Sequence, residues 1–264
     1  PVVYRRIGGA PAAIHRAARR RWHRFFMARA DAVVAVADAV RAETLALFRL
    51  EPARVVTIPN AVEPSRVQGA DRAVARAELG LPADSPVVLS LGALSWEKDP
   101  LGAVEASAPA RAADGTVVHL FVGDGPLRDP LEERVRRCGA EASVRVLPGR
   151  ADVAAVLAAA DVLLFTSRSD GMEGMPAVII EAGLAGRATV AVDVAGVGEV
   201  IEHDETGVLV AHPADVGDAL VALLDDPARV RALGAAARDR CEAAFTIEAV
   251  APRYADVLAR LVRR

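Results

Sequence analysis

Aromatic and cysteine residues are scarce in this 264-residue chain. Aromatic side chains make up only 4% of it, which leaves few rings on which nucleic-acid bases could stack. The net charge of −3 gives no overall attraction to polyanions. Cys138 and Cys241 have neither CxxC spacing nor a histidine cluster nearby, so we expect no metal and a reducing, cytoplasmic setting. Nucleic acid is not an expected partner.

Long hydrophobic runs and amino-terminal acids are also missing. No apolar run reaches the roughly 18 residues that a membrane-spanning helix needs. Residues 1–30 contain eight arginines and no acid. Within them, the predicted helix 13–30 carries Trp22, Phe25 and Phe26 among its arginines. Two interpretations stay open: the arginines face water while the aromatic rings pack inward, or the segment makes a peripheral contact with anionic lipid at the inner face of a membrane.

The hydrophobic pattern alternates between two kinds of segment. Short runs of Val, Leu and Ile without strict alternation are typical of strands covered on both faces, and segments of helical length separate them. Strands are predicted at 1–4, 32–37, 54–59, 87–92, 117–123, 144–147, 161–167, 188–193 and 207–210. Helices are predicted at 13–30, 38–49, 98–112, 126–139, 151–160, 176–185, 214–224, 227–244 and 247–262. This order predicts an α/β fold with a doubly wound parallel sheet.

A boundary is expected at residues 59–86, where Pro, Gly, Asn and Asp collect. Six predicted strands follow it, enough for a complete Rossmann-like domain, whereas the three before it would be the end of another. We therefore predict a partial Rossmann-like domain at 1–60, a complete one at 61–244, and a final helical segment at 245–264.

The loop SDGMEGMPAVIIEAG has the composition of a phosphate site at the carboxyl edge of the sheet, where open parallel sheets bind ligands. Pro176 suits the first position of a helix. The unpaired N–H groups of Ala177 and Val178, at the positive end of that helix, would then attract phosphate. Gly174 would let a ligand approach the backbone.

Two acids, Glu173 and Glu181, flank this predicted helix mouth. A lone buried carboxylate is costly, so Glu181 should have a hydrogen-bonding partner: the hydroxyls of a ribose or sugar diol, or a backbone N–H in the core. The pair could also serve a glycoside hydrolase. A dinucleotide oxidoreductase would need a third glycine that GDGPLRD lacks.

Several motifs in this order resemble the retaining glycosyltransferases of the GT-B fold, family 4 (group 1). DAVVAVADAVRAETLALF and RVVTIPNAVE resemble the family's passage into its interdomain linker. VVLSLGALSWEKDP, VHLFVGDGPLRDPLEE, and the stretch from VRVLPGRADV through EGMPAVIIEAGLAG resemble its later motifs. The resemblance implies a hexosyltransferase-type enzyme that moves a sugar from a nucleotide-sugar to a hydroxyl with retained configuration, without metal or cofactor; no DxD motif is present.

The resemblance also implies roles for particular residues. Glu173 matches the acid that contacts donor-sugar hydroxyls, Glu181 the acid that holds the ribose, and Lys98 the lysine that neutralises the diphosphate. The backbone at Gly149 and Arg150 falls where the family cradles the base. The remaining donor-binding positions are Gly174, Met175 and Val178.

The sequence departs from the family pattern in two ways. Ala93 replaces an arginine that pairs with the lysine on the diphosphate, so either Arg150 or Arg168 substitutes, or the chain is a non-catalytic homologue that binds nucleotide-sugar. Most of the amino-terminal acceptor domain is also missing. Residues 1–60 would be its remnant, 61–244 the donor domain, and 245–264 the helix that crosses back to the remnant. We expect this chain to be mainly the donor-binding half of an enzyme whose acceptor, lipid-linked in many members, is not specified.

Overall fold

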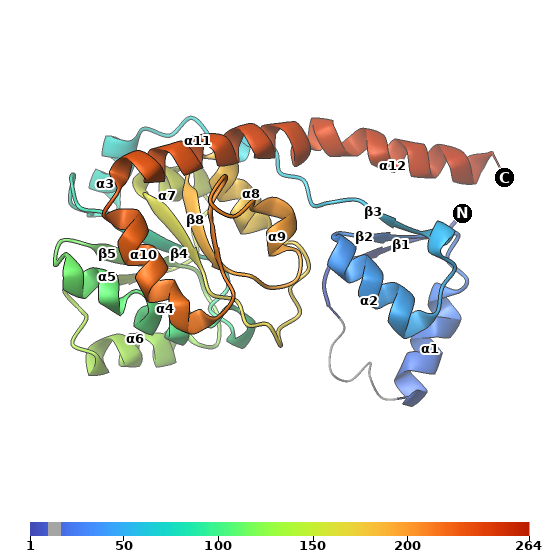
Figure 1. The fold of residues 1–264 in the computed structure, drawn as a ribbon, viewed down its shortest axis with the longest axis horizontal. Coiled ribbons are helices and arrows are strands. Elements are labelled where there is room, and N and C mark those ends of the chain that lie inside the picture. The colour runs from blue at the N-terminus through green and yellow to red at the C-terminus, as the bar shows by residue number, and fades with distance from the viewer. Residues whose placement is uncertain (10–16, 264) are drawn as a thin grey trace.

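The computed structural model describes residues 1–9 and 17–263 of the chain and contains two parallel sheets (Figure 1). The smaller sheet has the order β1-β2-β3 and the larger one the order β6-β5-β4-β7-β8-β9. The strands are β1 (Val3–Arg6), β2 (Ala32–Ala35), β3 (Val55–Thr57), β4 (Val87–Leu91), β5 (Val118–Val122), β6 (Val144–Leu147), β7 (Val162–Phe165), β8 (Ala188–Val192) and β9 (Val208–Val210).

The larger sheet has the strand order of a Rossmann-like domain. Its first strand, β4, lies between β5 and β7, and every pairing in the sheet is parallel. The chain therefore winds outward from β4 to β6, crosses back, and continues from β7 to β9, which creates a switch point between β4 and β7. The predicted doubly wound α/β fold is confirmed, as are the nine predicted strands.

Helices cover the sheets and join the two parts of the chain (Figure 1). They are α1 (Ala17–Met27), α2 (Asp38–Phe48), α3 (Arg72–Glu78), α4 (Pro100–Ala106), α5 (Ala108–Ala113), α6 (Arg128–Arg137), α7 (Val153–Ala159), α8 (Ala177–Leu184), α9 (Val197–Val200), α10 (Val216–Leu224), α11 (Pro227–Ala244) and α12 (Ile247–Val262). Among the described residues, none of these helices has the length and apolar character to cross a bilayer.

Two predicted helices differ from the structure, and two observed helices were not predicted. The single helix expected over 98–112 is two helices, α4 and α5, because Pro109 has no N–H to bond the carbonyl of Glu105. Two short helices, α3 and α9, were not predicted; α3 lies in the expected boundary segment. Of the predicted helix 13–30, residues 13–16 lie outside the described residues and α1 ends at Met27.

The final helix, α12, packs on the smaller sheet. Val250 and Val257 are buried against Ala32, Val34 and Ile58. The next residue, Leu258, is 49% exposed. The adjacent α11 packs instead on α8 and β8, so the two carboxyl-terminal helices connect the two sheets (Figure 1).

Candidate functional site

A crevice opens at the switch point between β4 and β7. These strands are paired, with Val88 opposite Val162, and the crevice lies between the loops that follow their carboxyl ends. The crevice is lined by Gly92, Ala93, Leu94 and Lys98 from the first loop and by Thr166 and Ser167 from the second. This is the edge at which the sequence predicted a ligand site, and it is the usual place for one in an open parallel sheet.

Two hydrogen bonds hold the turn that carries Lys98 against the loop after β7. The hydroxyl of Thr166 donates to the carbonyl of Lys98 at 3.2 Å, and the N–H of Arg168 donates to the carbonyl of Glu97 at 2.9 Å. Asp99 then adopts a left-handed conformation (φ 48°) and caps α4 by accepting from Gly102 at 3.2 Å. The lysine therefore projects from a fixed turn into the crevice.

Glycines in the next loop set the other wall of the crevice. An added Cβ on Gly123 would lie 1.8 Å from the carbonyl oxygen of Gly92, and one on Gly125 would lie 2.4 Å from that of Leu94. The GDG sequence is thus required by close packing of this loop on residues 92–94. That packing fixes the backbone around the exposed Ala93.

Lys98 and Glu173 meet in the crevice as an ion pair. Glu173 also accepts a hydrogen bond from the hydroxyl of Ser167 at 2.9 Å, and its side chain is only 12% exposed. The Lys98 side chain is 31% exposed, and its ammonium nitrogen lies 5.1 Å from the centre of the Phe165 ring. The structure therefore brings the two predicted catalytic residues together. It adds Ser167, which sequence reasoning missed because no pattern links that serine to Glu173.

Gly174 has a different neighbour from the one predicted. Its backbone was expected to admit a ligand, but the amino-terminal segment occupies that space. Gly174 forms a bridge with Gly8, and a Cβ on Gly174 would lie 2.3 Å from the carbonyl oxygen of Ile7. The glycine is needed where the two parts of the chain touch.

Met175 and Pro176 also differ from expectation. Met175 is buried, and its carbonyl accepts from the side-chain amide of Asn60 at 2.6 Å. Pro176 precedes α8 as its N-cap residue, whereas the sequence predicted it at the first helical position. The reason is its extended backbone (ψ 114°), which places the first helical turn at Ala177.

The first turn of α8 remains open. Among the described residues, the N–H groups of Ala177 and Val178 have no hydrogen-bond acceptor. Ala177 is exposed and Val178 is half-buried. The positive end of the helix dipole at this position can accept an anion.

Glu181 lies one helical turn beyond this open end, four residues after Ala177 and on the same face of α8. It is half-buried. Burial raises its pKa, while the positive charge of Arg66 acts in the opposite direction. The hydrogen-bonding partner expected from the sequence is not found: in the described part of the chain no donor contacts this carboxylate. Its oxygens are free to accept from a ligand.

Gly149 and Arg150 lie on the exposed loop after β6. The Gly149 N–H donates to Asp124 at 2.9 Å. Arg150 makes two hydrogen bonds to Asp152, at 2.8 and 2.6 Å, which raise the pKa of the guanidinium and lower that of the carboxylate. These groups have intramolecular partners and lie outside the crevice lining.

Neither arginine that was expected to replace the one missing at position 93 is free. Arg150 is held by Asp152, as above. Arg168 pairs with Asp170 at 3.0 Å and stacks over Trp96, with the guanidinium carbon 4.7 Å from the ring centre. In this structure Lys98 is thus the cation that lines the crevice. The described residues also contain no group of three or more His, Cys, Asp or Glu side chains that could hold a metal ion.

Comparisons with known proteins agree with this geometry. Residues 71–240 match the family described as "Glycosyl transferases group 1", and residues 3–66 match "Glycosyltransferase Family 4". The chain is 36% identical over 235 residues to a D-inositol 3-phosphate glycosyltransferase of Kineococcus radiotolerans, which covers 81% of this chain and 53% of that protein. It is 31% identical over 193 residues to the lipopolysaccharide core biosynthesis glycosyltransferase LpsD of Rhizobium meliloti, covering 72% and 54%. The chain spans about half the length of the relatives it matches.

Solved structures show the same fold. Anabaena Alr3699/HepE in complex with UDP and glucose superposes with a TM-score of 0.88 at 22% identity, covering 98% of this chain and 71% of that one. Sucrose-phosphate synthase of Thermosynechococcus elongatus gives a TM-score of 0.82 at 26% identity, covering 96% and 64%. Two parallel Rossmann-like sheets, a crevice at the switch point and family matches across both parts show that this chain belongs to the group 1, family 4 glycosyltransferases of the GT-B fold.

Proposed function

We propose that the crevice binds a nucleotide-sugar and that this chain is the donor-binding part of a retaining, metal-independent hexosyltransferase. One observation carries the proposal: Lys98 in the crevice pairs with Glu173, and the open first turn of α8 begins four residues after this acid. Glu181 presents an unpartnered carboxylate one turn further along. This arrangement offers positive charge for a diphosphate and carboxylates for hydroxyls on either side.

The chemistry assigns a task to each group. The bond between the anomeric carbon and the diphosphate oxygen breaks, and a bond from that carbon to the acceptor oxygen forms on the same face. The acceptor proton passes to the departing phosphate oxygen. Lys98 and the α8 N–H groups stabilise the charge that develops on that phosphate, while Glu173 orients the sugar and Glu181 holds the ribose.

Isothermal titration with UDP tests the donor site. UDP is the first probe because Alr3699/HepE was crystallised with UDP, with UDP and glucose, and with UDP-glucose. We expect Glu181→Gln to weaken UDP binding by about tenfold, since a charge-assisted hydrogen bond becomes a neutral one. Glu205→Gln is the matched control, because Glu205 is exposed and lies in a turn before β9. Equal affinities for all three proteins would contradict the proposal.

The alternative is a homologue that binds nucleotide-sugar without catalysing transfer. The exposed Ala93 favours it, because an arginine there would add a bidentate phosphate contact that this chain lacks. If the crevice is a donor site that lacks only an arginine at position 93, Ala93→Arg should tighten UDP binding about tenfold. An unchanged affinity for UDP would favour the hypothesis of a non-catalytic homologue. The same titration with UDP-glucose separates donor binding from nucleotide binding.

We further propose that α1 contacts an anionic membrane surface. Trp22, Phe25 and Phe26 are 61%, 53% and 51% exposed, which supports this proposal over the alternative in which these rings pack inward. The same helix carries Arg19, Arg20, Arg21 and Arg24. Aromatic rings beside basic residues suit an interface with anionic lipid. Residues 13–16 of this predicted surface lie outside the described residues.

Liposome co-sedimentation tests this contact. We expect the chain to sediment with vesicles that contain phosphatidylglycerol, and the double variant Trp22→Ser, Phe25→Ser to stay in the supernatant. Val74→Ser is the control, since Val74 is 57% exposed on α3. Equal sedimentation of all variants would dismiss the proposal. A hydroxyl acceptor of lipid-linked type, a cytoplasmic setting and the division at residues 60 and 244 remain proposals of the same kind.

A further inference from the structure

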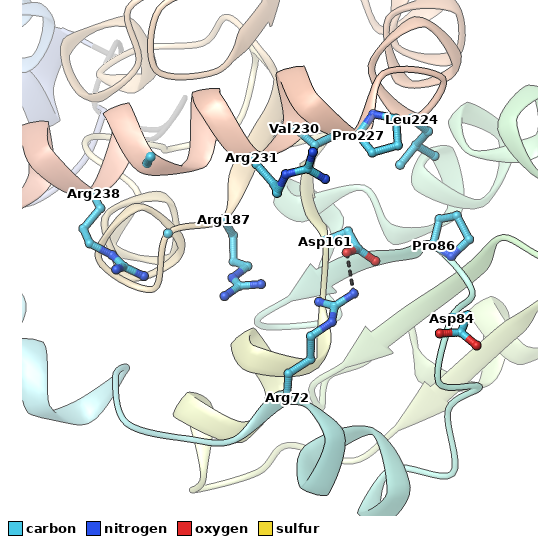
Figure 2. A pocket seen from close by; sticks show the side chains of 12 residues that line it. Arg72, Asp84, Pro86, Asp161, Arg187, Leu224, Pro227, Val230, Arg231 and Arg238 are labelled. Carbon is cyan, nitrogen blue, oxygen red and sulfur yellow. Dashed lines mark hydrogen bonds and ion pairs between the residues drawn. The ribbon is translucent and has the colours of Figure 1, made fainter.

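A second cavity, of about 580 Å³, lies at the opposite edge of the larger sheet. Pro86, Asp161 and Arg187, which line it, directly precede β4, β7 and β8. The crevice described above lies at the carboxyl ends of β4 and β7, so the two sites are separated by the length of the strands. Helices α3 and α11 close the sides of the cavity (Figure 2).

The wall of this cavity is rich in arginine. Arg72 from α3, Arg187 from the loop before β8, and Arg231 and Arg238 from α11 all line it. Figure 2 shows Arg72, Arg187, Arg231 and Arg238 arranged around the space between the two helices. These residues are far apart in the sequence, and only the packing of α11 across the sheet brings them together.

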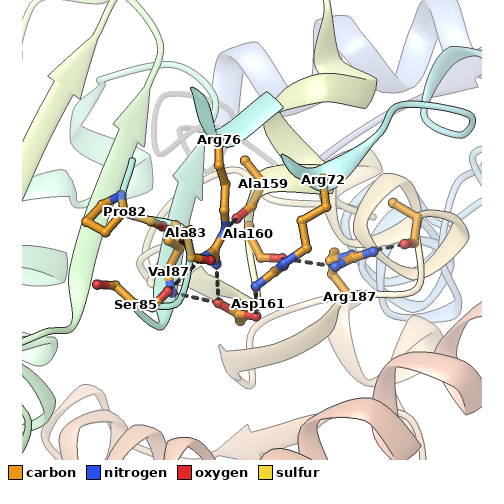
Figure 3. A network of polar contacts seen from close by, with 11 residues as sticks. Arg72, Arg76, Pro82, Ala83, Ser85, Val87, Ala159, Ala160, Asp161 and Arg187 are labelled. Atoms are coloured by element: carbon orange, nitrogen blue, oxygen red, sulfur yellow. Dashed lines mark hydrogen bonds and ion pairs between the residues drawn. The ribbon is translucent and has the colours of Figure 1, made fainter. Parts of the chain in front are cut away.

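The nearest carboxylate is already occupied. Asp161 accepts from Arg72 at 2.6 Å, from the buried Arg76 at 2.8 Å and from the N–H of Val87 at 2.8 Å (Figure 3). One carboxylate is thus shared by two guanidinium groups, so a net positive charge remains at this pair. The other acid in the lining, Asp84, is exposed.

Three arginines of the lining have no acidic partner among the described residues. Arg187 donates only to the carbonyls of Ala185 and Ala160, both at 3.0 Å. Arg238 donates to the carbonyl of Ala185 at 3.3 Å. Arg231 has no hydrogen bond or ion pair within the described chain. N–H groups of these three side chains remain available to an anion.

The lowered pKa of Arg187 agrees with a positive charge that no nearby acid fully compensates. Burial lowers its pKa, and the positive charges of Arg72, Arg238 and Arg76 lower it further, against the opposing effect of Asp161. An anion bound between these guanidinium groups would reduce both the desolvation cost and the mutual repulsion.

We propose that this cavity binds a small phosphate monoester, such as a sugar phosphate, independently of the donor crevice. Guanidinium groups match the oxygens of phosphate with paired hydrogen bonds. Leu224, Pro227 and Val230 form an apolar side of the same cavity against which a carbon skeleton can pack. The volume lies within the usual range for a small-molecule site, about 300–1,000 Å³.

Calorimetric titration of the full chain with glucose 6-phosphate tests the proposal. We expect saturable binding, weakened about tenfold by Arg231→Gln and by Arg238→Gln, because each removes a charge-assisted contact. Arg229→Gln is the matched control: it removes the same charge from the same helix, but Arg229 pairs with Asp204 away from the cavity. Lys98→Ala should bind the probe as the unmodified chain does.

Inorganic phosphate, used in a second titration, tells whether the phosphate group alone is recognised. Weaker but saturable binding, with the same dependence on Arg231 and Arg238, would support the site. Binding that is lost in Lys98→Ala and kept in the two arginine variants would assign the probe to the donor crevice and overturn the proposal. Equal weakening by Arg229→Gln, or no binding of glucose 6-phosphate up to about 10 mM, would also overturn it. Circular dichroism of each variant checks that its fold is intact.

Discussion

Glu181 combines a proposed functional role with a cost to the folded state. Its carboxylate has no donor in the described residues, and burial raises its pKa. A carboxyl whose pKa is higher in the folded than in the unfolded state favours the protonated form on folding. It therefore lowers stability above the unfolded value of 4.5, increasingly so up to the folded pKa.

This leads to a prediction about stability. Glu181→Gln should raise the melting temperature by about 2 °C at pH 7.5, while it weakens UDP binding. Thermal unfolding followed by circular dichroism at several pH values measures the effect. The difference from the unmodified chain should vanish as the pH falls below 4.5, where the carboxyl is protonated in both the folded and the unfolded chain. A melting temperature that falls on substitution would show that the carboxylate has a stabilising partner.

His119 on β5 gives a second pH dependence, unrelated to the site. The ring is fully buried, with Nδ1 2.8 Å from the Ser107 hydroxyl and Nε2 3.0 Å from the Ser90 hydroxyl. Burial, aided by the positive charge of Arg111, lowers its pKa from 6.5 to about 3. The unfolded chain therefore binds a proton between these values that the folded chain does not.

Acid should therefore destabilise the chain through His119. As the pH falls from 6.5 toward 3, this residue should reduce the free energy of unfolding by up to about 1.4 kcal/mol per pH unit. His119→Gln keeps polar atoms for both serines and removes the titration. Urea unfolding at pH 7.5 and 5 should show a smaller loss for the variant. An equal loss would mean that other groups account for the acid sensitivity.

Helix α2 begins without a side-chain cap of its own. Its N-cap residue, Ala37, has no side-chain acceptor, and Glu199 of α9 supplies one. The Glu199 carboxylate accepts from the N–H groups of Asp38 and Ala39, at 2.8 and 3.1 Å. An acid from the larger domain thus satisfies the first turn of a helix in the smaller one.

Removal of the Glu199 carboxylate should lower the stability of the chain, and a new N-cap residue should restore part of it. Glu199→Ala should lower the free energy of unfolding by about 1 kcal/mol, the usual effect of losing an N-cap. Ala37→Ser, added to that variant, should restore part of the loss, because a serine hydroxyl can accept from the first turn. Glu205→Ala is the control for removing an exposed acid. Urea unfolding of these three variants and of the unmodified chain measures the effect. No rescue by the serine would contradict the capping role.

Much at the level of helices and strands was predictable, since short apolar runs and segments of helical length indicate which residues are buried. The exceptions have local causes. Pro109 divides one expected helix, and α3 and α9 are too short for periodicity to reveal. The candidate residues Lys98 and Glu173 were predictable from their loops at the sheet edge. Their ion pair, and the serine that supports it, depended on how two loops pack.

Helix α12 follows the strands of the larger sheet in the sequence but packs on the smaller sheet, so it connects the two parts of the chain. Val257→Ala should lower the free energy of unfolding by about 2 kcal/mol, because Val257 is 5% exposed and packs on the smaller sheet. The adjacent Leu258→Ala should have almost no effect, since Leu258 is 49% exposed. Urea unfolding of both variants measures the contrast. Equal losses would mean that α12 does not pack as in Figure 1.

The sequence by itself determined the parallel α/β fold, because short apolar runs alternate with segments of helical length. It also predicted a ligand site at the carboxyl edge of the sheet and, through the family resemblance, proposed Lys98, Glu173 and Glu181 for it. Tertiary structure alone decided that Gly174 packs on the amino-terminal segment, that Glu199 caps α2, and that Arg72, Arg187, Arg231 and Arg238 line one cavity. Such groupings join residues far apart in the chain. They depend on how helices cross the sheet, which no local pattern encodes.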